Sequence, residues 1–301
     1  MKTLTALIVF VHLVFAAKGQ ELVLATYRYA ENDRIKNIAP LADEISKETG
    51  MSVGVKSYPT VHEFVQAIQN DEVDIALINT LGYLLLEAGN SSYSMYPSLV
   101  LQIRDDAKDN YKTAIVSSTA SGIRTLADAK QQAEQTNLLL VSPGSTSGNL
   151  VPRLIFNSRG IPNPESVFNS VSYGKTHKAT LESIAEGKVE LGALGSNEFF
   201  ESQKDPELAK KVHLVWLSPE IPLGPVLLHK RIEPKTAKSI QNTFLNLHES
   251  NKAALESVKS GWSEAAQTDQ YTPISEDYYD AFMKQSGDKK GMEKILKQFS
   301  N

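Results

Sequence analysis

Apolar and polar positions along the chain follow two different periods, which predict strands and helices in turn. Leu22–Thr26 and Val73–Asn79 are short apolar runs bounded by polar turns, as buried strands are. Ile35–Glu48 and Val61–Gln69 carry apolar residues at the spacing of amphipathic helices. Strands that alternate with helices favour an α/β fold with a mostly parallel sheet, in which ligands lie at the carboxyl ends of the strands.

The same alternation continues towards the C-terminus. Further strands are predicted at Met51–Ser57, Lys112–Ser117, Leu138–Val141, Val212–Leu217 and Pro225–His229, and further helices at Gly82–Ala88, Leu150–Arg159, Pro234–Glu249, Ala253–Ser260, Glu276–Ser286 and Met292–Phe299. From Pro234 onward the pattern is helical, and we expect these helices to pack back on the first part of the chain.

One arrangement of elements occurs twice, 116 residues apart. Leu22–Tyr27 resembles Leu138–Pro143 as an opening strand, and Val65–Thr80 matches Leu181–Ser196 in the order helix, polar turn, strand. Two matches at one offset predict two similar α/β lobes.

We expect lobe 1 to comprise residues 20–117 and 223–301, and lobe 2 residues 118–222. Chain crossings near Thr113–Gly122 and Pro219–Pro225 would then form a hinge.

The segment after the strand Leu138–Val141 carries the clearest sign of chemistry. Ser145, Thr146 and Ser147 supply three hydroxyls just before an amphipathic helix. The first N–H groups of a helix lack partners and carry partial positive charge, which favours an anion. Pro152 fits only near a helix start, so we expect the N-cap near Ser147–Asn149. We interpret the three hydroxyls as an oxyanion cradle; the alternative is that they only cap the helix.

Other strand ends should face the same place. Asn79 and Thr80 end the predicted strand Val73–Asn79, and Arg28 follows the first strand. A guanidinium matches an oxyanion with two hydrogen bonds, although a surface ion pair is an equal alternative for Arg28.

Composition and charge narrow the function. The chain is 41% hydrophobic, contains no cysteine and has a formal net charge of −4. It has no basic run of the kind that binds nucleic acid, and it can form neither a disulfide nor a cysteine-linked lipid anchor. A net-negative protein must bind an anion through local donors. We found no metal-binding spacing and expect no cofactor.

The N-terminus predicts export. Met1–Gly19 has an early lysine, an apolar run and small residues at its end, which are typical of a secretory signal peptide. Cleavage after Gly19 or after Ala17 is compatible with this pattern, and a buried N-terminal strand is the alternative. No other apolar stretch is long enough to span a membrane, so we expect a mature protein that is not membrane-embedded.

The residues VSPGSTSGNLVPRLIF resemble the signature of solute-binding proteins of phosphate/phosphite/phosphonate ABC transporters, a family of type II periplasmic binding proteins. The resemblance continues through IAPLADEISKETGMSV, DEVDIALIN, SGIRTLADAK and SYGKTHKATLESIAEGKVELGAL. It implies an α/β protein of two Rossmann-like lobes with mixed sheets. Such a protein closes around a small phosphorus oxyanion in the periplasm and presents it to a membrane permease.

The resemblance also assigns residues. It gives ligand donors to Ser145, Thr146 and Ser147, places a histidine at a helix start at His177 and a phenol at Tyr111. Imidazole and phenol are neutral donors of fixed direction, and histidine can also change charge near pH 7.

Two departures from the family pattern narrow the ligand. Thr60-Val61 stands where many phosphonate binders carry Asp-Tyr, and Gly224 stands where binders of aminoalkylphosphonates carry an aspartate. Without that carboxylate we expect phosphate, phosphite or a small alkylphosphonate.

Two alternatives use the same residues. In the first alternative, an extracytoplasmic serine hydrolase, Ser145 or Ser147 would be the nucleophile and His177 the base. The sequence has no G-x-S-x-G element, so we expect that the protein is not an enzyme. In the other alternative, the loaded protein signals to a membrane sensor kinase instead of a permease.

Overall fold

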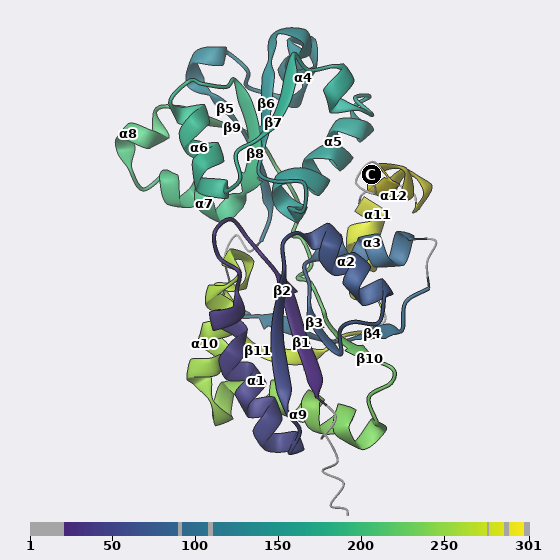
Figure 1. Ribbon diagram of the computed structural model, residues 1–301. Helices are drawn as coiled ribbons and strands as arrows, with labels where there is room; N and C mark the ends of the chain where they lie inside the picture. The colour runs from purple at the N-terminus through teal and green to yellow at the C-terminus, as the bar shows by residue number, and fades with distance from the viewer. Residues whose placement is uncertain (1–20, 90–91, 108–110, 276, 286–288, 298–301) are drawn as a thin grey trace, which may run out of the picture.

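The computed structural model describes residues 21–89, 92–107, 111–275, 277–285 and 289–297. The predicted signal peptide, Met1–Gly19, lies outside the described residues. The described chain forms two lobes, each a twisted sheet with helices on both faces (Figure 1). None of its helices is both long and apolar enough to span a bilayer.

Lobe 1 contains a six-stranded sheet in the order β11-β4-β10-β3-β1-β2. Its strands are β1 Leu22–Tyr27, β2 Val53–Tyr58, β3 Ile75–Leu77, β4 Met95–Ile103, β10 Val226–His229 and β11 Thr268–Pro273. Helices α1 Ile35–Thr49, α9 Pro234–Ser250 and α10 Lys252–Ser260 cover one face, and α2 Val61–Gln69 and α3 Thr80–Ala88 the other. Because side chains alternate along a strand, Leu24 of β1 packs under α1 and α9 while Ala25 faces α2.

Lobe 2 contains a five-stranded sheet in the order β7-β6-β8-β5-β9. Its strands are β5 Thr113–Ser118, β6 Asn137–Leu140, β7 Ser170–Tyr173, β8 Leu191–Gly195 and β9 Val212–Leu217. Its helices are α4 Leu126–Gln131, α5 Val151–Ser158, α6 His177–Ala185, α7 Ser196–Ser202 and α8 Pro206–Ala209. Short 3₁₀ turns of the two lobes lie at Thr119–Ser121, Ala133–Gln135, Pro164–Ser166 and Ser263–Ala265.

The two sheets share one topology. In lobe 1, β1 lies between β2 and β3 in parallel, and β10 and β4 follow in antiparallel order. In lobe 2, β6 lies between β7 and β8 in parallel, and β5 and β9 follow in antiparallel order. The repeat at 116 residues therefore reflects two similar lobes, as predicted.

One predicted boundary is wrong. The predicted strand Lys112–Ser117 falls in the expected lobe 1, with a crossing near Thr113–Gly122, but the observed strand β5 pairs with β8 and β9 in the second sheet. All six residues of β5 are buried, as expected for a strand inside a sheet. The first crossing therefore lies between Ile103 and Thr113, and the second joins β9 to β10 through residues 218–225.

Three strands were missed from the sequence. Prolines interrupt the patterns of two of them, with Pro97 inside β4 and Pro273 at the end of β11, and proline lowers the expectation of a strand. The third strand, β7, has no buried residue and so lacks an apolar run.

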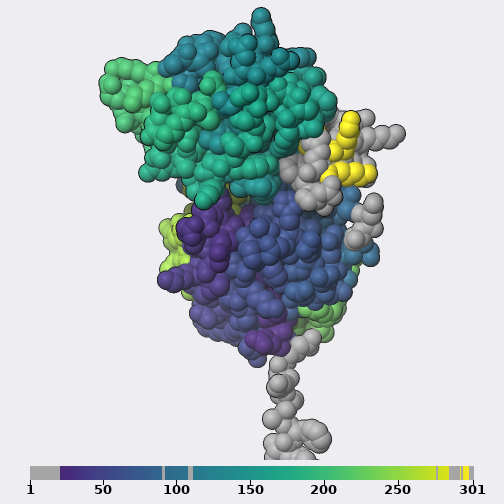
Figure 2. Space-filling view, turned by 45° about the horizontal axis from the view of Figure 1, so that its top comes forward, coloured from purple at the N-terminus to yellow at the C-terminus, as the bar shows by residue number. Residues whose placement is uncertain are grey.

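The C-terminal segment touches both lobes, not lobe 1 alone as we expected. Its helices are α11 Asp280–Gln285 and α12 Lys289–Leu296. Helix α12 packs against α3 of lobe 1 and α5 of lobe 2, and Ile295 shares a buried cluster with Leu154 (Figures 1 and 2). Just before α11, the Tyr278 hydroxyl accepts from the Leu223 N–H at 3.1 Å and the Tyr279 hydroxyl donates to the Leu223 carbonyl at 2.8 Å. The segment thus holds the second crossing as well.

Gly224, in that crossing, should tolerate no side chain. A Cβ there would lie 1.9 Å from the Ile78 carbonyl oxygen and 2.5 Å from the Asn79 Cα, both backbone atoms. We predict that Gly224→Ala lowers the free energy of unfolding by about 1–3 kcal/mol or more, measured by urea denaturation.

Gly195→Ala is the matched control for Gly224→Ala. The nearest atoms to a Cβ at Gly195 lie 3.5 Å away, an ordinary contact, so its stability should change much less. Equal stability of the two variants would contradict the close approach at Gly224.

Candidate functional site

A cleft of about 850 Å³ lies between the lobes, on the side where the strands β1 and β6 end. Figure 2 shows lobe 2, in teal and green, seated on lobe 1, in purple and blue. The cleft is lined by the loop after β1, the start of α2, the loop before α5 and the starts of α6 and α7. Its lining includes Tyr27, Arg28, Tyr29, Arg34, Thr60, Val61, Asn79, Tyr111, Ser142, Gly144, Ser145, Thr146, Lys175, His177, Glu198 and Glu264.

The segment Gly144–Gly148, the hydroxyl loop, leads into a wide helical turn. Thr146–Leu150 is a π-helix that continues as α5. Ser145 is the N-cap, because its Oγ accepts from the Gly148 N–H at 2.9 Å, so the predicted N-cap near Ser147–Asn149 is wrong. For Ser145, the alternative of simple helix capping therefore holds in this structure.

The π-turn explains how Pro152 fits beyond the first turn. The Leu150 N–H donates to the Ser145 carbonyl, and the Val151 N–H to the Thr146 carbonyl. The next bond in this series would join residue 152 to the Ser147 carbonyl, and proline has no N–H to make it. Instead, the Thr113 hydroxyl donates to the Ser147 carbonyl at 2.7 Å.

Ser147 is the member of the loop whose hydroxyl is unused. Its side chain is fully buried, and its Oγ has no hydrogen-bond partner among the described residues. Its backbone N–H donates to the Tyr111 hydroxyl at 3.3 Å, and burial raises the pKa of Tyr111, which keeps this phenol neutral. A buried hydroxyl without a partner costs free energy. Ser147 itself is not among the residues that line the cleft, although its neighbours Ser145 and Thr146 are.

His177 begins α6 and lies close to Ser147. Its Nδ1 accepts from the Gly195 N–H at 2.9 Å, which leaves the proton on Nε2. A Cβ built on Gly195 would be 3.5 Å from both the Ser147 Oγ and the His177 ring, so the two side chains flank this glycine. Burial lowers the pKa of His177 to about 4. The expected change of charge near pH 7 is therefore absent in this structure.

The lobes touch directly beside the hydroxyl loop. The Asn79 Nδ2 donates to the Gly144 carbonyl at 2.9 Å, and the Leu81 N–H donates to the Thr146 hydroxyl at 3.1 Å. Asn79 also caps α3, since its Oδ1 accepts from the Gly82 N–H. Asn79 and Thr146 thus join the two lobes.

Thr80 lies at the hinge instead of the cleft. Its hydroxyl donates to the Pro222 carbonyl at 2.5 Å, in the second crossing, and Thr80 is not among the residues that line the cleft. Thr60, the first residue of the Thr60-Val61 departure from the family pattern, caps α2 by accepting from the Glu63 N–H at 3.1 Å.

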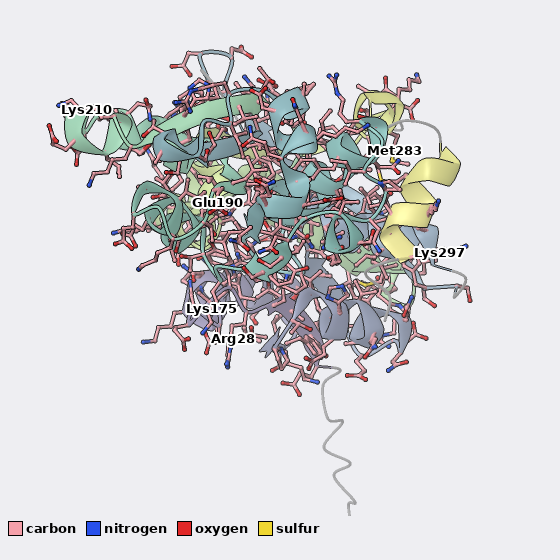
Figure 3. All side chains as sticks on the ribbon, turned by 90° about the horizontal axis from the view of Figure 1, so that it is seen from above. Arg28, Lys175, Glu190, Lys210, Met283 and Lys297 are labelled. Carbon is pink, nitrogen blue, oxygen red and sulfur yellow. The ribbon has the colours of Figure 1, made fainter. Side chains whose placement is uncertain are left out.

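Two arginines line the cleft: Arg28, which was selected from the sequence, and Arg34, which was not. Arg28 is exposed at the rim of the cleft, and Figure 3 shows it at the same edge of the molecule as Lys175. Arg34 lines the cleft but is only 3% exposed. Its Nε donates to the Gly261 carbonyl at 2.8 Å and its Nη1 to the Tyr27 carbonyl at 3.3 Å.

Three aromatic rings surround the Arg34 guanidinium. Its central carbon lies 4.7 Å from the ring centre of Tyr27, 5.5 Å from that of Tyr29 and 4.4 Å from that of Trp262. Sequence reasoning missed Arg34 because a single arginine in a polar turn is usually exposed. Two of its three aromatic neighbours precede it by seven and five residues, but Trp262 comes from the far end of the chain.

No group of three or more histidine, aspartate or glutamate side chains in the described part of the chain could hold a metal ion. The donors of the cleft are hydroxyl, imidazole and guanidinium groups, which suit an anion.

Two α/β lobes of this topology around a cleft define the bilobal fold of type II periplasmic binding proteins. Residues 25–277 match the family model described as ABC transporter, phosphonate, periplasmic substrate-binding protein, and the chain belongs to this family.

Similar proteins come from several bacteria. The phosphonates-binding periplasmic protein of Escherichia coli is 24% identical over 228 residues, which cover 74% of this chain and 65% of that protein, slightly under two thirds of its length. A probable ABC transporter phosphite-binding protein of Prochlorococcus marinus is 22% identical over 247 residues, or 77% of this chain and 80% of that one.

A solved structure has the same fold. The binding component of a phosphonate ABC transporter from Pseudomonas aeruginosa superposes with a TM-score of 0.66 at 18% identity, covering 93% of this chain and 94% of that one. None of these matches supports the sensor-kinase alternative.

The low pKa of His177 predicts an acid-sensitive structure. Its pKa falls from 6.5 to about 4 on burial, so the unfolded chain binds the proton more readily and stability decreases as the pH falls from about 6.5 to 4. The loss is less than about 3 kcal/mol, because the half-buried ring retains some contact with solvent. Thermal unfolding across this pH range measures it.

His177→Asn is the comparison variant for this pH dependence. Its side-chain oxygen can accept from the Gly195 N–H but does not titrate. The decline in melting temperature below pH 6.5 should be shallower than in the unmodified protein, and identical declines would show that His177 does not contribute.

Proposed function

We propose that this protein captures a small phosphorus oxyanion in the cleft, in the periplasm, and delivers it to an ABC transporter permease. The observation that carries this proposal is the buried Ser147 hydroxyl without a partner, close to the neutral His177 imidazole. Phosphate, phosphite and a small alkylphosphonate share the oxyanion that these donors suit. Family membership and the names of the similar proteins support this ligand class.

The donors of the cleft fit an oxyanion better than a cation. Ser147 contributes an O–H, His177 an Nε2–H, and Arg34 the N–H groups that do not bond to Gly261 and Tyr27. The Tyr111 hydroxyl supports the loop by accepting from the Ser147 N–H. Arg34 is buried and makes no ion pair among the described residues, although the Glu264 carboxylate of the same cleft acts on it electrostatically. An anion in the cleft could therefore pair directly with the Arg34 guanidinium.

The contacts between lobes support a closing mechanism. Asn79 and the Leu81 N–H of lobe 1 bond directly to the hydroxyl loop of lobe 2. A ligand that binds to both lobes would add its own hydrogen bonds to these contacts and would favour the closed arrangement of the lobes. A closed protein presents a joint surface from both lobes, which is the surface we propose that the permease recognises. The predicted signal peptide supports export to the periplasm.

We infer binding without turnover. A serine nucleophile needs a base within hydrogen-bond reach, but Ser145 Oγ is committed to Gly148 and Ser147 Oγ has no partner in the described part of the chain. Hydrolysis of a phosphoester by the purified protein would contradict this inference.

Ligand screening tests the proposed class. Protein refolded from denaturant to remove any carried ligand should show a raised melting temperature with phosphate, phosphite or methylphosphonate, because a ligand that binds only the folded state stabilises it. Sulfate at the same concentration is the comparison anion. If no phosphorus oxyanion raises the melting temperature, the proposal is wrong.

Ser147→Ala should separate stability from binding. Removing a buried hydroxyl that has no partner should leave the unliganded protein as stable as before, or more stable by about 1–3 kcal/mol. The same change removes a donor to a charged ligand, so affinity should fall about 10- to 150-fold by isothermal titration calorimetry.

Ser142→Ala is the control for Ser147→Ala. Unlike Ser147, Ser142 lines the cleft directly, and its hydroxyl makes no hydrogen bond to a described residue. Affinity should change little in this variant. Unchanged affinity in Ser147→Ala would remove Ser147 from the binding site.

A further inference from the structure

The cleft is much larger than a phosphorus oxyanion. Its volume is about 850 Å³. A tetrahedral oxyanion of five heavy atoms fills on the order of 100 Å³, a few times the share of one water molecule in the liquid. Volumes of about 300–1,000 Å³ are typical of sites that hold larger organic ligands. Most of the cleft is therefore space that the oxyanion itself does not occupy.

Further closing of the lobes would not remove this space, because the lobes already touch around it. Asn79 of lobe 1 bonds to the hydroxyl loop of lobe 2. The His177 N–H donates to the Tyr29 hydroxyl at 3.3 Å. The Asn197 Nδ2 donates to the Ser263 carbonyl at 3.4 Å. Three different pairs of elements are thus in contact, and the volume belongs to a closed arrangement of the lobes.

Tyr173 presents an aromatic ring to this space. It ends β7 and lines the cleft. Its side chain is 39% exposed, and it is one of two large apolar side chains among the described residues that are exposed. An exposed ring in a cavity offers a flat apolar face on which another ring can stack. The proposed oxyanion site makes no use of this ring.

A buried arginine fixes the position of the ring. Arg153 is only 5% exposed, and its Nη2 donates to the Tyr173 hydroxyl at 3.3 Å. Its Nη1 donates to the Glu165 carboxylate and its Nε to the Asn149 Oδ1, both at 2.9 Å. The Asn149 Nδ2 in turn donates to the Pro143 carbonyl at 2.8 Å. One network thus holds the Tyr173 ring and the residues that flank the hydroxyl loop.

The Tyr173 ring and the His177 imidazole belong to one short turn. The Gly174 N–H donates to the Leu140 carbonyl at 2.8 Å, which ties this turn to the end of β6. Cα atoms that are four residues apart in the chain lie within about 14 Å of each other. A ligand whose oxyanion bonds to His177 can therefore reach the Tyr173 ring with its substituent.

We propose that the ligand of this cleft is a phosphorus oxyanion that carries a planar aromatic substituent. The oxyanion lies at the hydroxyl loop and His177, and the aromatic ring of the ligand stacks on Tyr173. This inference rests on the proposed function and specifies its substrate class. Inorganic phosphate, phosphite and a small alkylphosphonate occupy only the oxyanion part of the cleft and bind more weakly.

Methylphosphonate, phenylphosphonate and cyclohexylphosphonate are the matched probes. They share one head group, and their substituents are small, planar, or bulky without being planar. We expect phenylphosphonate to bind about tenfold more tightly than either of the others by isothermal titration calorimetry, the gain from one stacked pair of rings. Equal affinities for phenylphosphonate and cyclohexylphosphonate would mean that the cleft accepts any apolar group, and would overturn the proposal.

Tyr173→Ala tests the stacking partner. Because Tyr173 is exposed at the end of a strand, its loss should not unfold the protein. The affinity for phenylphosphonate should fall about tenfold, and that for methylphosphonate should stay within about twofold. Tyr173→Phe keeps the ring and loses only the hydroxyl that Arg153 bonds, so it should retain the preference for phenylphosphonate. Loss of methylphosphonate binding in both variants would show that Tyr173 acts only by holding Arg153, against the proposal.

Tyr96→Ala is the control variant. Tyr96 lies on β4 of lobe 1, is half-buried and does not line the cleft. The ratio of phenylphosphonate to methylphosphonate affinity should stay as it is in the unmodified protein. Equal losses of the ratio in Tyr96→Ala and Tyr173→Ala would show that the loss does not come from a ring in the cleft, and the proposal would be wrong.

The proton resonances of the bound ligand give a readout that a merely structural role of Tyr173 would not change. Protons above the face of a neighbouring ring are shielded. The ring protons of phenylphosphonate should therefore shift upfield on binding to the unmodified protein and to Tyr173→Phe, and much less on binding to Tyr173→Ala. The same shift in all three proteins would contradict stacking on Tyr173.

The outcomes separate this inference from the proposed function. If phosphate or methylphosphonate binds and phenylphosphonate has no advantage, the ring subsite at Tyr173 is wrong and the proposed function stands. If no phosphorus oxyanion binds, both are wrong.

Discussion

The meeting of the two sheets at one pair of loops is the constraint on which the rest of the structure depends. The Asn79 side chain and the Leu81 N–H, which follow β3, bond to the loop that follows β6. A Cβ on Gly144 would lie 2.9 Å from the side chain of Val61 at the start of α2, so the hydroxyl loop approaches lobe 1 as closely as a glycine allows. The carboxyl ends of both sheets thereby share one cleft, and residues from distant parts of the chain line it together.

The hydrogen-bond donors in and next to that cleft differ in the free energy that their burial costs when no ligand is bound. Ser145 and Thr146 have partners within the protein, whereas the Ser147 hydroxyl and the Arg34 guanidinium have unused donors. Burying donors that have no hydrogen-bond partner costs free energy, and a suitable anion that accepts from them would recover part of that cost. Affinity in such a site arises from the groups that the fold leaves unsatisfied, and the satisfied hydroxyls fix the shape of the loop.

Much of the fold could be predicted because it depends on local periodicity. The helix α2 was predicted at its observed bounds, and the repeat at 116 residues revealed two lobes, since each lobe buries the same alternation of strand and helix. The order in which the strands pair within each sheet could not be predicted in the same way. The strand β5 belongs to lobe 2 because its partners are β8 and β9, and hydrogen bonding between strands far apart leaves no mark in the periodicity of either.

The candidate site shows the same division. Residues on one continuous loop, such as Ser147, could be selected from the sequence, and the structure places His177 beside it. Arg34 could not be selected in this way, because one of the rings that cover its guanidinium, Trp262, comes from an element far along the chain. Thr80 was selected for its place at a strand end, yet its hydroxyl is used by Pro222 in the second crossing. Neighbours from other parts of the chain decide whether a polar side chain is available to bind a ligand or makes a hydrogen bond within the protein.

The strand order also fixes which lobe can be completed first as the chain is synthesised. Lobe 2 is a continuous segment, and all its strands are present once β9 ends at Leu217. In lobe 1, β3 and β4 are joined only through β10, which begins at Val226, and β11 follows still later. A chain synthesised only as far as β9 therefore has every strand of the lobe 2 sheet but lacks β10 and β11 of the lobe 1 sheet. The edges of β3 and β4 stay unpaired until the C-terminal segment is made. The lobe that starts first is finished last.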